Sequence, residues 1–148
     1  MRYEKELNFI KEKMAVAYER FSAQERKVEQ KRAFDLVTDL DRNIERYLTA
    51  EIKKAFPCDM VQGEEFSAEP KMEGRVWSLD PIDGTCNMAN GSKLYGVQVA
   101  LLENGETMLG LVYLPHFGEW YYAVRGGGAW CNGERIHVND GVDLQNAL

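Results

Sequence analysis

The stretch W-S-L-D-P-I-D-G-T, residues 77–85, constrains the fold of this 148-residue chain more than any other. The apolar segment Arg75–Leu79 is typical of a buried strand, and the carboxylates of Asp80 and Asp83 follow it closely. We expect Asp80 to emerge at the strand end and Pro81 to force a turn there, because proline fixes φ near about −65°. This turn would bring the two carboxylates together, which is unfavourable unless a cation lies between them.

The oxygen atoms around this predicted turn are of the kind that Mg²⁺ prefers. The two carboxylates and the carbonyl group of Ile82 would supply hard oxygen ligands. Gly84 would let the backbone approach a ligand, and a helix beginning at Thr85 would offer free N–H groups to a phosphate. An alternative remains open, in which Asp80 and Asp83 only cap the turn and the helix, as aspartates commonly do.

Two further acidic stretches favour the metal site over capping. In G-E-E, Glu64 and Glu65 follow the apolar strand candidate M-V-Q, residues 60–62. In D-L-V-T-D-L-D, Asp35 and Asp41 surround the start of a predicted helix. A charge run is more often a solvated surface, but these acids stand at the ends of apolar segments. They are therefore placed to reach the same rim as the aspartates of D-P-I-D.

The first half of the chain predicts two amphipathic helices. Apolar side chains spaced by three or four positions mark the first helix from Leu7 to Phe21. A second stripe runs from Leu40 to Phe56; Thr38 or Asp39 would cap this helix, and Pro57 would end it.

After Pro57, short strands and tight turns replace the helical pattern. Strands are predicted at 60–62, 75–79, 94–102, 108–114 and 119–124, with a further tight pair in 125–138. Two Asn-Gly dipeptides favour hairpin turns. The order of two helices followed by a mostly antiparallel sheet predicts the α+β class. The end of the chain, N-D-G-V-D-L-Q-N-A-L, resembles the entry to a further element, so we expect a covering segment beyond it.

Composition excludes some partners. The net charge of −6 argues against nucleic acid and against an anionic membrane surface, since both repel an acidic protein. There is no apolar run of about 18 residues and no signal-peptide pattern. The cysteines, Cys58, Cys86 and Cys131, are odd in number and widely spaced, which favours reduced thiols and a cytoplasmic location. Only His116 and His137 are available for a histidine-based metal site.

The motifs D-L-V-T-D-L-D, G-E-E, W-S-L-D-P-I-D-G-T-C-N and G-G-G-A-W-C-N-G-E-R-I-H-V occur in the order and spacing of a known family. From Asp35 to Val138 the chain resembles the inositol monophosphatase-like superfamily of Mg²⁺-dependent, Li⁺-sensitive phosphatases. The resemblance implies the first half of a layered αβαβα fold. It also implies hydrolysis of a small sugar, inositol or other polyol phosphate, and a homo-oligomer.

The resemblance assigns roles to matched positions. Glu64, Asp80 and the Ile82 carbonyl would hold one Mg²⁺, and Asp80 with Asp83 would share a second; two or three ions are expected. Gly84 and Thr85 would bind the phosphate. Thr85 and Asp41 would orient and deprotonate the attacking water, with Glu65 as an outer participant. These roles agree with two-metal activation of water.

The match has departures. Family members continue for over a hundred residues and supply another metal-ligating aspartate, so we expect residues 1–148 to be an amino-terminal metal- and phosphate-binding domain without the carboxy-terminal one. This favours an alternative function, a non-catalytic binding module or an assembly partner that docks through an exposed sheet edge. Asn90 stands where the family often has histidine. Either Gln30 or Lys31 would match the metal-site lysine. Lys31 is preferred of the two, but a lysine simply exposed to solvent is the commoner case, and Cys86 is interpreted as a bystander.

Overall fold

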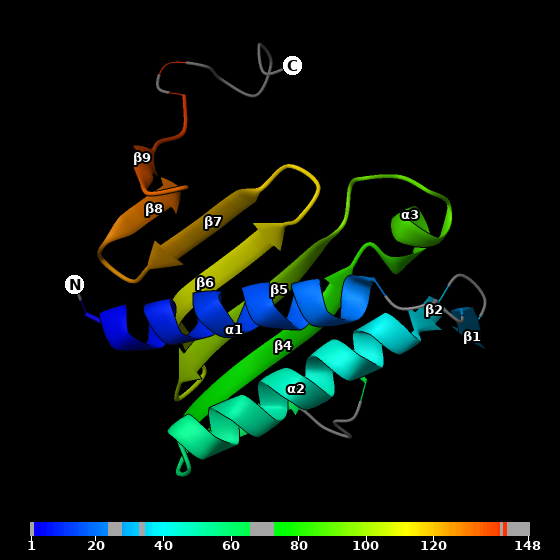
Figure 1. Cartoon of the computed structure of the whole chain (residues 1–148). Coiled ribbons are helices and arrows are strands. Elements are labelled where there is room, and N and C mark those ends of the chain that lie inside the picture. Colours follow the sequence, from blue (N-terminus) through cyan, green and yellow to red (C-terminus); the bar gives the residue numbers. More distant parts are fainter. Residues whose placement is uncertain (1, 24–27, 33–34, 66–72, 140, 142–148) are drawn as a thin grey trace.

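Two long helices lie side by side on one face of a seven-stranded sheet (Figure 1). This computed structural model describes residues 2–23, 28–32, 35–65, 73–139 and 141. The arrangement is the predicted α+β class, with strands that are mostly antiparallel, so that prediction is confirmed.

Helices α1 (Glu4–Ser22) and α2 (Asp39–Ala55) form where the apolar stripes predict them. Each helix buries one apolar stripe against the sheet. Two charged residues of α2, Asp41 and Glu45, are buried with its stripe. The buried side chains of the two stripes include Leu7, Ile10, Met14 and Ala17 of α1 and Leu40, Ile44, Leu48 and Ile52 of α2.

The ends of α2 follow from local chemistry. Thr38 is the N-cap, and it forms a capping box with Asp41 in which each side chain pairs with the backbone N–H of the other. At the other end Phe56 is the C-cap, and Pro57 follows it, because the residue before a proline is disfavoured in helical conformation. Both predicted boundaries of α2 are confirmed.

The main sheet has the order β3-β4-β5-β6-β7-β8-β9, so strands that follow one another in sequence are neighbours in space. Only β3 and β4 pair in parallel; every other neighbouring pair in this sheet is antiparallel. The strands are β3 (Met60–Gly63), β4 (Arg75–Asp83), β5 (Gly96–Glu103), β6 (Glu106–Leu114), β7 (Glu119–Val124), β8 (Gly128–Cys131) and β9 (Glu134–Ile136).

Three smaller elements lie near the end of β4. Strands β1 (Val28–Arg32) and β2 (Asp35–Thr38) pair in a separate antiparallel hairpin. Sequence reasoning predicts no hairpin there, because V-E-Q-K-R lacks an alternating apolar pattern. The short helix α3 (Thr85–Ala89) begins at the predicted residue and lies close to β2.

Both Asn-Gly dipeptides form the predicted hairpin turns. Asn104 and Gly105 have φ values of 50° and 82°, and Asn132 and Gly133 have 50° and 91°. Positive φ at both central residues is what a type I′ turn requires, and its twist matches that of the flanking strands.

Strand β4 is longer than predicted. The expected turn at Pro81 is wrong, because the strand continues to Asp83 and the chain turns at Gly84 instead. The pairing explains how proline is tolerated: the register with β3 ends at the Gly63–Leu79 pair, and the register with β5 is irregular between Asp80 and Asp83. The missing N–H of Pro81 therefore removes no hydrogen bond from either ladder.

Within the described residues, no helix has the length and apolar character needed to cross a membrane. The three cysteines form no disulfide, as predicted. Residues 139–148, interpreted as the entry to a further element, lie almost wholly outside the described residues.

An ion cluster joins several segments at the start of β4. The Arg75 guanidinium donates to Asp59 at 3.0 Å, to Glu6 at 2.9 Å and to Glu103 at 2.9 Å. The Asp59 side chain is only 7% exposed and also accepts from the Trp77 indole N–H at 2.9 Å. One guanidinium thus links α1, the segment before β3, and strands β4 and β5.

We expect Arg75→Met to lower the free energy of unfolding by about 2–3 kcal/mol, because it leaves three carboxylates close together without their cation. Arg125→Met is the matched control, since Glu106 is the one ion-pair partner of Arg125 within the described residues, at an exposed site with side chains 54% and 59% accessible. That control should cost about 0.5 kcal/mol or less. Urea unfolding measures both values, and equal losses would contradict the role of the Arg75 cluster.

Candidate active site

Four segments that carry the predicted site residues meet at one end of the sheet (Figure 1). Because β3 and β4 are parallel, their carboxyl ends lie at the same edge, which brings Glu64 after β3 near Asp80 in β4. The amino terminus of α2 brings Asp41 to this place, and α3 brings Thr85.

The carboxyl group of Asp80 has a strongly raised pKa. Its pKa is raised to about 7, first by burial, then by the negative charges of Glu64 and Asp83, by a hydrogen bond with Glu64 and by the charge of Asp41. Its Oδ1 atom is buried and has no hydrogen-bond partner among the described residues. A carboxylate oxygen that is buried, unpartnered and surrounded by other carboxylates is one that a cation would stabilise.

Asp41 and Thr85 form a hydrogen-bonded pair. Asp41 is 2% exposed, and its Oδ2 accepts from the Thr38 N–H at 3.0 Å and from the Thr38 hydroxyl. The Thr85 hydroxyl oxygen lies 3.1 Å from Asp41 Oδ1 and 2.9 Å from the Ile82 carbonyl oxygen. This hydroxyl has a single hydrogen, so it donates to one of the two acceptors at a time.

The turn between β4 and α3 requires glycine. Gly84 has φ 87°, in the left-handed region, and a Cβ atom there would lie 3.1 Å from the Leu94 carbonyl oxygen. The backbone therefore reverses directly between Asp83 and Thr85, and the first turn of α3 begins beside the carboxylates.

Sequence reasoning missed two residues that hold this site. Gln98 of β5 is paired in register with Asp80, and its side-chain amide donates to Asp83 Oδ2. Glu45 of α2 is 1% exposed, and its Oε2 accepts the backbone N–H of Glu65 at 2.7 Å. Both could have been found from the sequence as polar residues among apolar ones. Gln98 stands between two valines, and Glu45 stands beside Ile44 in the stripe of α2.

The predicted metal ligands differ in their exposure to solvent. Glu64 and Asp83 are exposed, Asp80 is half-buried, and the backbone of Glu65 is held by Glu45. Among the described residues, no three or more acidic, histidine or cysteine side chains already enclose a possible metal position. The side chains of Lys31 and Asp35 lie outside the described part of the structure.

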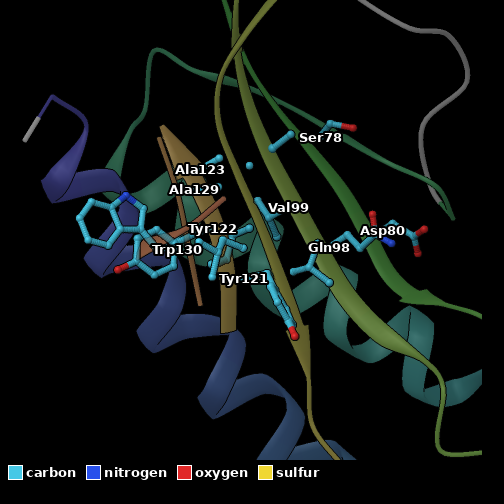
Figure 2. A pocket seen from close by; sticks show the side chains of 14 residues that line it. Ser78, Asp80, Gln98, Val99, Tyr121, Tyr122, Ala123, Ala129 and Trp130 are labelled. Carbon is cyan, nitrogen blue, oxygen red and sulfur yellow. The ribbon is translucent and has the colours of Figure 1, made fainter. Parts of the chain in front are cut away.

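A groove of about 400 Å³ extends from Asp80 across the sheet face that the helices leave open (Figure 2). Its floor is a row of small residues, each directly opposite the next on neighbouring strands. The row consists of Ser78, Ala100, Gly110, Ala123 and Ala129. Figure 2 shows Gln98 and Tyr121 along the groove and Trp130 toward the far end from Asp80.

Comparison with known proteins agrees with this geometry. The sequence model of the inositol monophosphatase family matches residues 4–148. The chain is 41% identical over 122 residues to the fructose-1,6-bisphosphatase/inositol-1-monophosphatase of Thermotoga maritima, covering 82% of this chain and 47% of that protein. It is 45% identical over 103 residues to the histidinol-phosphatase of Chlorobaculum parvum, covering 70% of this chain and 40% of that protein.

A solved structure shares the fold. An IMPase/NADP phosphatase complexed with Mg²⁺ and phosphate superposes with a TM-score of 0.80 at 31% identity, covering 93% of this chain and 53% of that chain. The chain thus spans about half the length of the relatives that it matches.

The raised pKa of Asp80 predicts the pH dependence of stability in metal-free protein. Between about pH 4 and 7 the folded state holds a proton that the unfolded state has lost, so the free energy of unfolding falls as pH rises through this window. Asp80→Asn should therefore be more stable than the wild type at pH 8, and this advantage should shrink at pH 4.5. Urea unfolding in EDTA at both pH values measures the difference; an advantage that does not change with pH would contradict the prediction.

Proposed function

We propose a phosphatase function for this chain on the premise that it belongs to the inositol monophosphatase family. The proposed reaction is Mg²⁺-dependent hydrolysis of a phosphate monoester by direct attack of water. The observation that carries the proposal is the buried, unpartnered Asp80 oxygen, surrounded by carboxylates, next to the Asp41–Thr85 pair.

The donor set fits magnesium. Glu64, Asp80 and the Ile82 carbonyl would hold one ion, and Asp80 with Asp83 would share another, all through hard oxygen atoms. Bound there, such ions would polarise the phosphoryl oxygens and lower the pKa of the attacking water. The Ile82 carbonyl and Asp41 compete for the single hydrogen of the Thr85 hydroxyl. If the carbonyl were bound to an ion, the hydroxyl would donate to Asp41, as the reaction requires.

The protein's own part in the reaction is proton transfer and orientation. The Thr85 oxygen would accept a hydrogen bond from the attacking water while its hydroxyl proton points to Asp41. As water attacks phosphorus, the ester P–O bond breaks, one proton passes from the water to Thr85, and the Thr85 proton passes to Asp41. The leaving alkoxide takes its proton from solvent. Gly84 and Thr85 would hold the phosphate by their backbone N–H groups at the start of α3, and Glu65 would act from the outer shell.

Other parts of the proposal extend the family likeness. The substrate would be a small phosphorylated sugar, inositol or other polyol, with two or three Mg²⁺ ions, inhibition by Li⁺, a homo-oligomeric state and a cytoplasmic location. The free cysteines are consistent with a reducing compartment. Neither nucleic acid nor membrane is a proposed partner, because the net charge of −6 repels both.

The direct test is phosphate release by the intact gene product with a panel of inositol, sugar and histidinol phosphates. We expect Mg²⁺-dependent release, and we expect Thr85→Ala and Asp41→Asn each to lower kcat about 100-fold or more, since each interrupts proton transfer. Cys86→Ser is the control, because Cys86 is exposed and is proposed to take no part. The proposal fails if no substrate of the panel is hydrolysed, or if both variants retain full activity.

A second candidate is a non-catalytic metal- or phosphate-binding module that acts as an assembly partner. The sequence predicts docking through a sheet edge, but the surface that favours this candidate is a sheet face. Helices cover one face, whereas the small-residue groove on the other has no cover among the described residues. The relatives are about twice as long as the matched segment, so we take their additional carboxy-terminal region as the occupant.

Gly110→Glu tests this candidate, because a Cβ atom at Gly110 meets nothing within 4 Å and the change should spare the fold. We expect the chain to bind the isolated carboxy-terminal region of the Thermotoga maritima relative in calorimetry. Gly110→Glu should weaken binding at least 10-fold, whereas Thr107→Glu, at an exposed position of the same strand, should not. Equal binding by all three, or self-association of the chain in place of binding, would contradict this occupant.

A further inference from the structure

The carboxylate of Glu45 is nearly inaccessible to solvent, yet it lies outside the proposed ligand set. Its side chain is 1% exposed, on the face of α2 that packs on β3 and β4. It stands four residues after Asp41, so the two carboxylates share one face of the helix, one turn apart. Burying a carboxylate is costly, so its contacts indicate what it holds.

Glu45 holds the turn that follows β3 at two points. Its Oε2 accepts the backbone N–H of Glu65 at 2.7 Å. Its carboxyl group also fills the space beside Gly63, where an added Cβ atom would overlap Oε1 and Cδ of Glu45. Gly63 is buried, so neither group has room to move away without disturbing the packing.

Glu64 lies between these two points of attachment. Glu45 packs against Gly63 and accepts the N–H of Glu65, and the pairing of Gly63 with Leu79 places Glu64 beside Asp80. Strand β3 has four residues, and among the described strands it pairs with β4 alone, so the sheet itself restrains its end weakly. The contact with α2 supplies the missing restraint.

We propose that Glu45 is a positioning residue for the divalent cation, acting through the backbone of residues 63–65 to hold Glu64 against Asp80. This inference rests on the proposed function, because it assumes that Glu64 and Asp80 share a cation. The geometry also explains the pairing of a long acid on α2 with glycine at the end of β3. A larger residue at 63 would displace the carboxylate, and a shorter acid at 45 would not reach the Glu65 N–H.

The test is calorimetric titration of this chain with Mn²⁺, with circular dichroism to verify folding. We expect Glu45→Ala to weaken Mn²⁺ binding about 10-fold or more, as outer partners of metal ligands typically do when removed. Glu45→Gln keeps the length and an acceptor oxygen, so it should stay within about 3-fold of the wild type. Glu51→Gln is the matched control at the far end of α2, where Glu51 pairs with Lys13 at 3.2 Å, and it should change nothing.

A double variant separates positioning from a general loss of structure. If Glu45 acts through Glu64, then Glu45→Ala should add no further loss of Mn²⁺ affinity in a Glu64→Gln background. A merely structural role would weaken binding by the same factor in both backgrounds. Faster hydrogen exchange of the Glu65 amide in Glu45→Ala gives a readout that needs no metal.

The outcomes are distinguishable. Wild-type affinity in a folded Glu45→Ala would overturn the role of Glu45 alone. Failure of the wild-type chain to bind Mn²⁺ would overturn the proposed metal site together with this role. If Glu45→Ala does not fold, Glu45→Asp serves instead, because it keeps the charge but is too short to reach the Glu65 N–H; about 10-fold weaker binding supports the proposal and unchanged binding overturns it.

Discussion

Negative charge is concentrated at the carboxyl end of β4, and the surrounding structure is arranged around that constraint. Asp41 is compensated by the N–H and hydroxyl groups of Thr38 and by Thr85. Asp83 accepts from the Gln98 amide. Asp80, at the centre, keeps a buried oxygen without a donor among the described residues. The surrounding hydrogen-bond donors therefore leave the buried Asp80 oxygen uncompensated, and this oxygen is suited to bind a cation.

Helix α2 positions two parts of this arrangement with side chains one turn apart. Asp41 reaches toward the start of α3, and Glu45 reaches toward the end of β3. The same helix packs its apolar stripe on the sheet. This core packing therefore also sets the position of both carboxylates relative to the sheet. Packing and site geometry are coupled here, because buried side chains occupy well-defined rotamers.

Much of the fold is predictable because its signals are local. Helical periodicity and the Thr38 cap locate α2, and Asn-Gly dipeptides locate two hairpin turns. Pro81 shows where local reasoning fails: proline suggests a turn, but the strand continues because both neighbouring ladders are interrupted at that point. That information lies in the pairing of β4 with two other strands and not in the proline itself.

The same distinction applies to the candidate site. The association of Asp41 with Thr85 follows from recognisable motifs, and the structure brings these residues together. Gln98 and Glu45 carry no motif of their own, and their importance depends on register with Asp80 and on contact with a turn twenty residues away in sequence. Such residues become visible only once strands and helices are placed against one another.

The two charged clusters of the molecule occupy opposite ends of β4. Arg75 stands at its first residue, and the acidic site begins at Asp80. A strand rises about 3.3 Å per residue, so about 16 Å separate them along the backbone. That span exceeds the screening length of about 8 Å at physiological ionic strength. Sites so far apart that share no partner usually contribute additively to stability. A change of charge or a bound ion at the acidic end therefore shifts the free energy of unfolding without breaking the ion pairs of Arg75 at the other end.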